Sequence, residues 1–174
     1  IGIEGGDPSS RIYGAAIDIG TTTVAISVVD MLTGKILADA SALNAQKKYG
    51  ADVLTRISHE MDNGQEGIDQ LADAAKKAGI PVEEIYEIAI AANNTMMHLL
   101  LGIDGRPIGT APYAPMFSES RTMPAKTIGL KGAPGAMLYC LPSVSAFIGA
   151  DITAGAYVCD LIHSTEKVMF IDIG

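Results

Sequence analysis

Three runs of strand-forming residues follow one another near the start of the chain, separated by turns too short to hold a helix. The runs cover residues 12–19, 22–29 and 35–43, with Gly20 and Gly34 in the turns. β-Branched and apolar residues favour strands, whereas a parallel connection would need a crossover of about a dozen residues or more. The sequence therefore predicts an antiparallel three-stranded meander, which every later element must extend or cover.

Beyond the meander the apolar residues change to helical spacing, and helical and strand-like segments then alternate. Expected helices cover 53–61, 68–78, 95–101 and 143–161, and expected strands cover 85–92, 126–130, 136–141 and 166–173. Residues 102–123 are rich in glycine and proline and are expected to be irregular, with one short strand at most. Later strands are reached through helical crossovers, so we expect an α/β fold with a mixed sheet and helices on both faces.

Charge and hydropathy bear on the partners of the chain. Its 174 residues carry a net charge of -8 and contain no run of basic residues. Nucleic acids and anionic membrane surfaces attract clustered Lys and Arg, so neither is expected as a partner. No apolar stretch has the length that a bilayer span requires. Cys140 and Cys159 both lie in apolar surroundings, so we expect buried, reduced thiols and a cytoplasmic location.

The first turn of the meander has the composition of an anion-binding loop. Asp18 precedes Gly20, and Thr21, Thr22 and Thr23 follow. Backbone N–H groups and hydroxyls in such a turn can face a phosphate, while the carboxylate holds a hydrated Mg²⁺ beside it. Gly20 allows a close approach to the backbone. The alternative from composition alone is an ordinary tight turn with threonines on the strand.

A second apolar-Asp-Ile-Gly run, at residues 168–174, favours the functional interpretation of the first. Two such copies resemble the two phosphate loops of the actin, sugar kinase and Hsp70 superfamily, in which two ribonuclease H-like lobes bind ATP in the cleft between them. The resemblance implies that Asp172 and Gly174 face Asp18 across the cleft. It also implies that Asp172 orients a water molecule or the metal, and that Gly174 contacts the nucleotide.

Four further motifs carry a closer resemblance, at residues 13–23, 44–57, 94–103 and 149–151. Together they resemble the ATP-dependent reductive activators of corrinoid proteins, which are multidomain iron–sulfur ATPases of anaerobes. The resemblance implies ATP and Mg²⁺ as cofactors and a corrinoid protein as the partner. Its cobalt(II) is reduced to cobalt(I), which reactivates a methyltransferase system. The electron is expected to come from a [2Fe-2S] domain upstream, with no cluster in this chain.

The resemblance also implies a domain division. Residues 1–10 are expected to be a linker tail, 11–165 a first ribonuclease H-like ATPase lobe with a five-stranded sheet, and 166–174 the first strand of a truncated second lobe. With only half of the nucleotide site, the fragment alone is expected to be inactive. Its unpaired last strand invites pairing with a second copy, so a homodimer is a further option.

Further site residues are less clear from the sequence. Relatives in the superfamily carry a carboxamide or carboxylate near the Pro that opens the last helix, but Leu141 stands before that Pro here, so Asp151 is the substitute candidate for the catalytic base. Asn94 and Thr95 are candidate nucleotide contacts, with a helix cap as the alternative. His98 lies among apolar residues and is expected to be packed in the core or at its partly exposed edge, and not to be a ligand.

Other functions of the same superfamily remain open from the sequence. A small-molecule kinase would share the phosphate loops. An activator of radical dehydratases would share them too, but such proteins carry a Cys pair that binds a bridging [4Fe-4S] cluster, and Cys140 and Cys159 are too far apart for a short cluster-binding loop. A non-catalytic assembly domain of the actin type is the alternative from another functional class.

Overall fold

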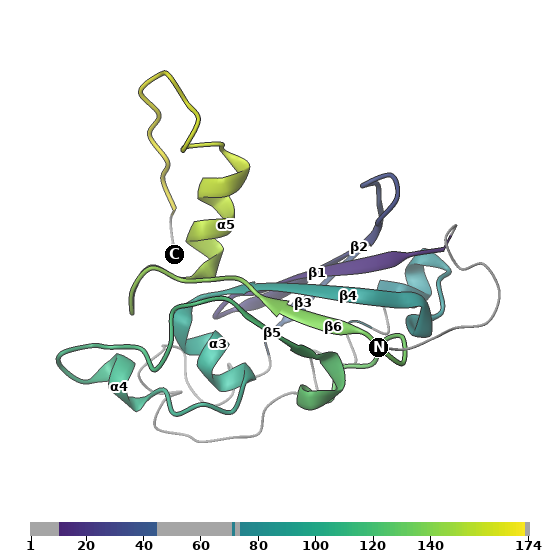
Figure 1. Cartoon of the computed structure of the whole chain (residues 1–174), viewed down its shortest axis with the longest axis horizontal. Coiled ribbons are helices and arrows are strands. Elements are labelled where there is room, and N and C mark those ends of the chain that lie inside the picture. The colour runs from purple at the N-terminus through teal and green to yellow at the C-terminus, as the bar shows by residue number, and fades with distance from the viewer. Residues whose placement is uncertain (1–10, 45–70, 72–73, 173–174) are drawn as a thin grey trace.

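A mixed sheet of six strands forms the centre of the fold (Figure 1). The computed structural model describes residues 11–44, 71 and 74–172. Its strands are β1 (Tyr13–Ile19), β2 (Thr23–Asp30), β3 (Ile36–Leu43), β4 (Ile85–Ala92), β5 (Arg121–Pro124) and β6 (Met137–Cys140). Their order across the sheet is β3-β2-β1-β4-β6-β5.

The first three strands form the antiparallel meander that the sequence predicts. β4 pairs in parallel with β1, and β6 pairs in parallel with β4, so the chain must cross over the sheet to reach each of them. β5 pairs antiparallel with β6 at the edge. The mixed α/β sheet is confirmed, with six strands among the described residues where five were expected.

The additional strand lies just before a segment where the sequence-based expectation was wrong. The strand expected at 126–130 is instead a 3-10 turn, η4 (Ala125–Ile128), and the extended residues come just before it in β5. Gly129 ends the turn with a φ of 79°, a left-handed conformation that cannot continue a strand. The local apolar pattern was therefore compatible with a strand, but the backbone reverses there.

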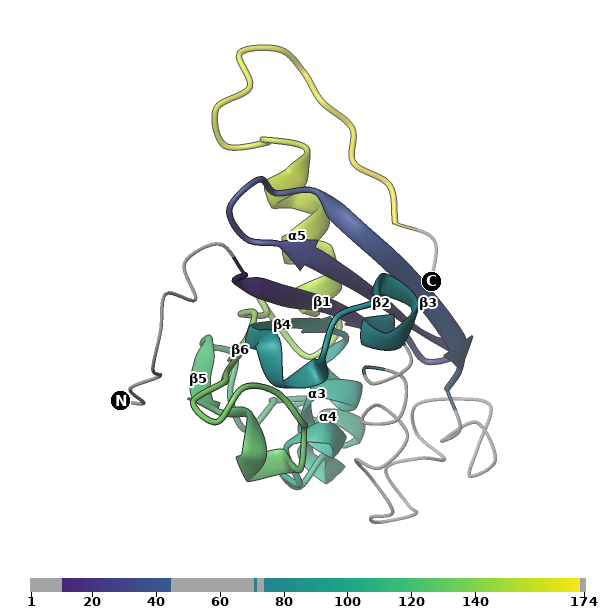
Figure 2. The ribbon, with the colours of Figure 1, turned by 90° about the vertical axis from the view of Figure 1, so that its right-hand side faces the viewer.

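Helices cover both faces of the sheet, as expected. The described helical elements are η3 (Val82–Glu84), α3 (Asn94–Leu100), α4 (Arg106–Gly109) and α5 (Ala150–Val158), in addition to residues 74–78. α5 stands on one face, whereas α3 and α4 lie on the opposite face (Figures 1 and 2). The expected helix over 53–61 lies outside the described residues.

The last helix begins seven residues later than the sequence predicts, at Ala150 instead of residue 143. The preceding residues form a loop closed by a bridge between Ser145 and Ile148. Gly149 is the N-cap residue, and its backbone lies directly against the end of β4. The helix start is therefore determined by contact with the sheet, which local helix signals do not encode.

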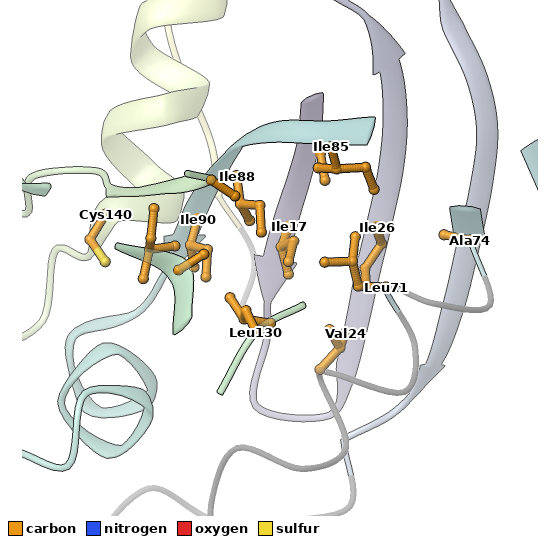
Figure 3. Packing of buried hydrophobic residues seen from close by; sticks show 14 of the residues in the cluster. Ile17, Val24, Ile26, Leu71, Ala74, Ile85, Ile88, Ile90, Leu130 and Cys140 are labelled. Atoms are coloured by element: carbon orange, nitrogen blue, oxygen red, sulfur yellow. The ribbon is translucent and has the colours of Figure 1, made fainter. Parts of the chain in front are cut away.

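The main core lies on the face of the sheet opposite α5. Figure 3 shows Ile17 of β1, Ile26 of β2 and Ile90 of β4 pointing toward Leu71 and Leu130. Each of these side chains is at most 6% exposed. Burial of such side chains stabilises the fold by about 1.5–3 kcal/mol each. Every second residue of the central strands therefore packs into this core.

The end of the chain departs from the sequence-based expectation. Residues 167–172 are extended but pair with no described strand, so the strand expected over 166–173 is wrong for the described part of that segment. Without a partner strand, its backbone groups lack ladder hydrogen bonds. The segment instead runs back along α5 (Figure 1), where Phe170 packs closely against Gly155.

No described helix is long and apolar enough to cross a membrane.

Candidate functional site

The carboxyl ends of three neighbouring parallel strands meet at one edge of the sheet. β1 leads into Gly20, β4 into Asn93 and β6 into Leu141, and the three strands are adjacent in the order β1-β4-β6. In open α/β sheets, ligands bind in the crevice outside these carboxyl ends. This edge is therefore where the residues that the sequence predicts for the site are compared with the structure.

The turn between β1 and β2 is tight and is held from outside. The Gly20 N–H donates to the Thr23 carbonyl oxygen at 2.9 Å. A Cβ at Gly20 would lie 2.9 Å from the same oxygen, so a residue with a side chain does not fit without a shift. Asn44 is 5% exposed and supports the turn twice, since its backbone N–H donates to the Thr22 carbonyl at 2.7 Å and its side-chain amide to the Gly20 carbonyl at 2.8 Å.

Asn93, which the sequence analysis did not select, connects this turn to α3. Its Oδ1 accepts a hydrogen bond from the Met96 N–H at 3.0 Å and so caps the helix. Its Nδ2 donates to Thr21 Oγ1 at 3.1 Å. The Asn93-Asn94 pair was a visible signal, but the sequence alone does not decide which of the two side chains turns toward the loop.

Asn94 and Thr95 do not reach the turn. Each is 2% exposed, and the Asn94 amide donates to the backbone carbonyl of Ser145. Both the cap and the contact with the loop belong to Asn93 instead. The physical reason is register, because Asn93 is the first residue beyond β4 and its side chain still points to the carboxyl edge of the sheet, whereas the next two residues begin the buried turn of α3.

Two carboxylates from distant parts of the chain act electrostatically on Asp18. Asp18 is an exposed residue of β1, Asp151 lies in the first turn of α5, and Asp172 lies in the extended end segment. Although the residue is exposed, neighbouring protein atoms partly desolvate its carboxyl group, which raises the pKa of Asp18, and the negative charges of Asp151 and Asp172 raise it further. The charges of Asp151 and Asp172 thus reach Asp18, and these three are the acidic residues that the sequence predicts for catalysis. Gly174 lies outside the described residues.

Contact between α5 and β4 positions Asp151. A Cβ at Gly149 would lie 2.5 Å from the Cα of Asn93 and 2.9 Å from the Ala92 carbonyl oxygen, so glycine is required for this approach. Asp151 Oδ1 accepts a hydrogen bond from the Ile152 N–H at 2.9 Å. This bond orients the carboxylate at the start of the helix.

The donor set suits a hydrated cation better than one bound by protein ligands alone. No group of three or more His, Cys, Asp or Glu side chains among the described residues is arranged to hold a metal ion. Mg²⁺ usually keeps several water ligands and takes one or two carboxylates. A divalent cation near Asp18 would relieve the repulsion that raises the pKa of that carboxyl group. The residues therefore fit a water-mediated Mg²⁺ site of the kind expected for Asp18.

Of the two packed positions that the sequence allows for His98, the structure shows the buried one, and both ring nitrogens are hydrogen-bonded. It is 0% exposed. Its Nε2 accepts from the Met116 N–H at 3.1 Å, so that atom carries no proton, and Nδ1 donates to the Asn94 carbonyl at 2.7 Å. Burial is the main cause that lowers the pKa of His98, and its ring stacks on Phe117 at 4.6 Å.

The two cysteines have different environments, which corrects the expectation that both are buried. Cys140 is 0% exposed, and burial raises the pKa of its thiol to about 11. Cys159 is exposed beyond the end of α5. α5 ends one residue before Cys159, so the side chain there has no sheet to pack against.

Comparisons with known proteins agree on one family. The family model described as RACo middle region matches residues 13–164. The chain is 29% identical to the corrinoid activation enzyme RamQ of Eubacterium limosum over 184 aligned residues, covering 99% of this chain and 30% of that protein. It is also similar to a solved structure, a reductive activator for a corrinoid, iron–sulfur protein, with 34% identity and a TM-score of 0.84.

That structural match covers 92% of this chain and 27% of the solved one. The chain thus spans about a third or less of the length of these relatives. The high TM-score shows that the meander, the parallel strands and the covering helices form the same fold in both. From the family match over most of its length, we conclude that the chain belongs to the RACo middle region family.

Proposed function

We propose that this chain is the first ATPase lobe of a reductive activator of corrinoid proteins. The observation that carries the proposal is the tight glycine–threonine turn directly after Asp18, whose carboxyl pKa is raised in part by the charges of Asp151 and Asp172, in a chain of this family. A phosphate site needs donors for the anion and carboxylates for its cation, and both lie at this edge. Family membership favours the activator over the kinase, dehydratase-activator and assembly alternatives.

In this proposal the turn binds the phosphates of ATP. The hydroxyls of Thr21 and Thr22 donate to phosphate oxygens, and Thr23 begins the strand behind them. Asp18 holds Mg²⁺ through water, and the ion neutralises charge on the phosphates. Asp172 orients a water molecule or the metal, and Asp151 is the candidate general base. Both support the proposal by acting on the same carboxylate, Asp18.

The proposed reaction couples two balanced changes. Water hydrolyses ATP to ADP and phosphate, while one electron passes from a reduced iron–sulfur domain to cobalt(II) of the corrinoid protein, which becomes cobalt(I). The names of the two relatives support the corrinoid partner. We propose that the remaining length of the relatives corresponds to further domains of a longer protein, including the electron donor and a second lobe that begins near residue 166.

The test follows the corrinoid spectrum in the full-length protein with a reductant, with and without Mg-ATP. We expect cobalt(I) to form only with Mg-ATP. Asp18→Ala should lower the ATP-dependent rate by about 100-fold or more, since it removes an electrostatic contact to the reacting centre. The matched control is Glu83→Ala, which removes an exposed carboxylate at the opposite end of β4 and should leave the rate unchanged.

Two results would contradict the proposal. One is formation of cobalt(I) at the same rate without ATP. The other is an ATP-dependent rate that Asp18→Ala and Glu83→Ala affect equally, since the carboxylate at the turn would then have no special part in the reaction.

A further inference from the structure

The Asn93 side chain leaves no ambiguity about which of its atoms faces which partner. The Met96 backbone N–H can only donate, so the side-chain atom 3.0 Å from it is the carbonyl oxygen. The other side-chain atom is therefore the amide nitrogen, which donates to Thr21 Oγ1 at 3.1 Å. The cap of α3 thus determines that Thr21 Oγ1 accepts a hydrogen bond from Asn93.

This assignment controls the direction of the Thr21 hydroxyl hydrogen. A hydroxyl has one hydrogen to donate and rotates freely when nothing holds it. Because Asn93 occupies a lone pair of Oγ1, the O–H bond of Thr21 points away from the amide and remains available to another acceptor. An acceptor-only group, such as a phosphate oxygen, is the partner that this arrangement suits.

We infer that Asn93 is a positioning residue for nucleotide binding. It presents the Thr21 hydroxyl as a donor to a phosphate oxygen and does not itself touch the phosphate. The inference rests on the proposed function, since it assumes that the turn after β1 binds the phosphates of ATP. The inference adds Asn93, which lies outside both apolar-Asp-Ile-Gly runs, to the residues that form the proposed site.

The surroundings hold Asn93 in this position. Ala92, its predecessor, is the last residue of β4 and is paired with Ile19 of β1, which places the two strand ends side by side. Gly149 packs against the Cα of Asn93 from the other side. Asn94 is tied to the Ser145 carbonyl. A side chain held between β4, α3 and the start of α5 has little freedom, so its amide is preorganised to hold the Thr21 hydroxyl.

A double-mutant cycle in the full-length protein tests the inference. Thr21→Val removes the hydroxyl at nearly constant volume. Asn93→Ser keeps a side chain that caps helices well but is too short to replace the amide. The measured quantities are the dissociation constant for Mg-ATP by calorimetry and the midpoint of thermal unfolding, for the wild type, both single variants and the double variant.

We expect Thr21→Val to weaken Mg-ATP binding by about 10-fold or more, the effect of one hydrogen bond to a charged group. Asn93→Ser should weaken it by roughly 3- to 10-fold, since the hydroxyl remains but is no longer oriented. In the Thr21→Val background, Asn93→Ser should change the dissociation constant by less than about twofold, because the two residues act as one unit. The unfolding midpoint of Asn93→Ser should stay within about 3 °C of the wild type.

Other outcomes overturn the inference. If Asn93→Ser weakens binding equally in both backgrounds, Asn93 acts through general structure and not through Thr21. If Asn93→Ser has no effect, the Thr21 hydroxyl does not need it. Asp18→Ala separates these results from failure of the proposed function. If the wild type binds Mg-ATP and the Asp18→Ala variant does not, the nucleotide site is present and only the role of Asn93 is in question. If the wild type binds no nucleotide, the proposed function itself is overturned.

Discussion

Two asparagine side chains support the turn after β1 from positions outside it. Asn44 holds the carbonyl of Gly20 from the end of β3, and Asn93 holds the hydroxyl of Thr21 from the end of β4. When a buried or partly buried amide loses its hydrogen-bond partner, the folded state is destabilised by about 1–3 kcal/mol. The shape of the turn therefore depends on residues more than twenty positions away, even though its own composition suggests a self-contained loop.

At the scale of single residues, His98 makes stability depend on pH. The unfolded chain binds a proton at this residue near pH 6.5, whereas burial lowers the pKa of His98 in the folded state. Protonation would also remove Nε2 as acceptor for the Met116 N–H. The stability contributed by neutral His98 is complete above pH 6.5 and is lost as the pH falls below that value toward the lower folded pKa.

We therefore expect the free energy of unfolding of the wild type to fall between about pH 7 and pH 5, measured by urea titration. His98→Leu should lower it by about 1–3 kcal/mol at neutral pH, because the Met116 N–H loses its partner, and should flatten the pH dependence. The matched control is His163→Leu, which changes an exposed histidine. Equal slopes for wild type and His98→Leu would show that another group is the sensor.

At the scale of elements, the position of α5 depends on its first residue. The helix begins where Gly149 lies against the end of β4. Gly149→Ala would place a Cβ 2.5 Å from the Asn93 Cα, in contact with backbone that cannot rotate away. We expect a loss of about 1–3 kcal/mol in the free energy of unfolding, which is typical of overpacking, and weaker Mg-ATP binding, because α5 carries Asp151 away from Asp18.

A second change in the same helix provides the control. Ala154→Gly lies in the middle of α5 and costs about 1 kcal/mol through helix propensity, without any clash at the sheet. We expect it to reduce stability but to leave nucleotide affinity unchanged. If both variants reduce affinity equally, loss of stability alone explains the effect and the contact at Gly149 has no part in positioning Asp151.

At the scale of the whole molecule, the proposed site depends on three segments that are far apart in the chain. Asp18 comes from the first strand, Asp151 from the last helix and Asp172 from the segment that returns along that helix (Figure 1). Their negative charges disfavour ionisation of Asp18. The folded state thus keeps a repulsion that a bound cation would relieve, which is a common property of sites that bind Mg²⁺ and phosphate.

This convergence predicts how the Asp18 carboxyl group titrates. Asp151→Asn removes a negative charge and should lower the raised pKa of Asp18 toward its ordinary value of 3.8. Asp160→Asn, at an exposed carboxylate beyond α5 that forms an ion pair with His163, should leave it unchanged. A ¹³C NMR titration of the carboxyl groups measures both. Identical Asp18 curves in wild type and Asp151→Asn would show that the two residues are too distant to interact.

The sequence by itself determined the meander, the strand at 85–92 and the turn at Gly20. These features follow from local rules, because strand alternation, turn length and apolar surroundings are properties of neighbouring residues. The same rules failed at η4, at the start of α5 and at the unpaired end segment. In each of these places a local pattern fitted two conformations.

Only the tertiary structure decided which asparagine faces the turn after β1 and which carboxylates act on Asp18. The adjacent residues Asn93 and Asn94 have the same side chain, and the register at the end of β4 directs one to Thr21 and the other to the Ser145 carbonyl. Likewise, Asp18 and Asp151 interact because Gly149 lets α5 approach the sheet. Contacts between distant segments depend on how the elements pack, and that packing is absent from any local stretch of sequence.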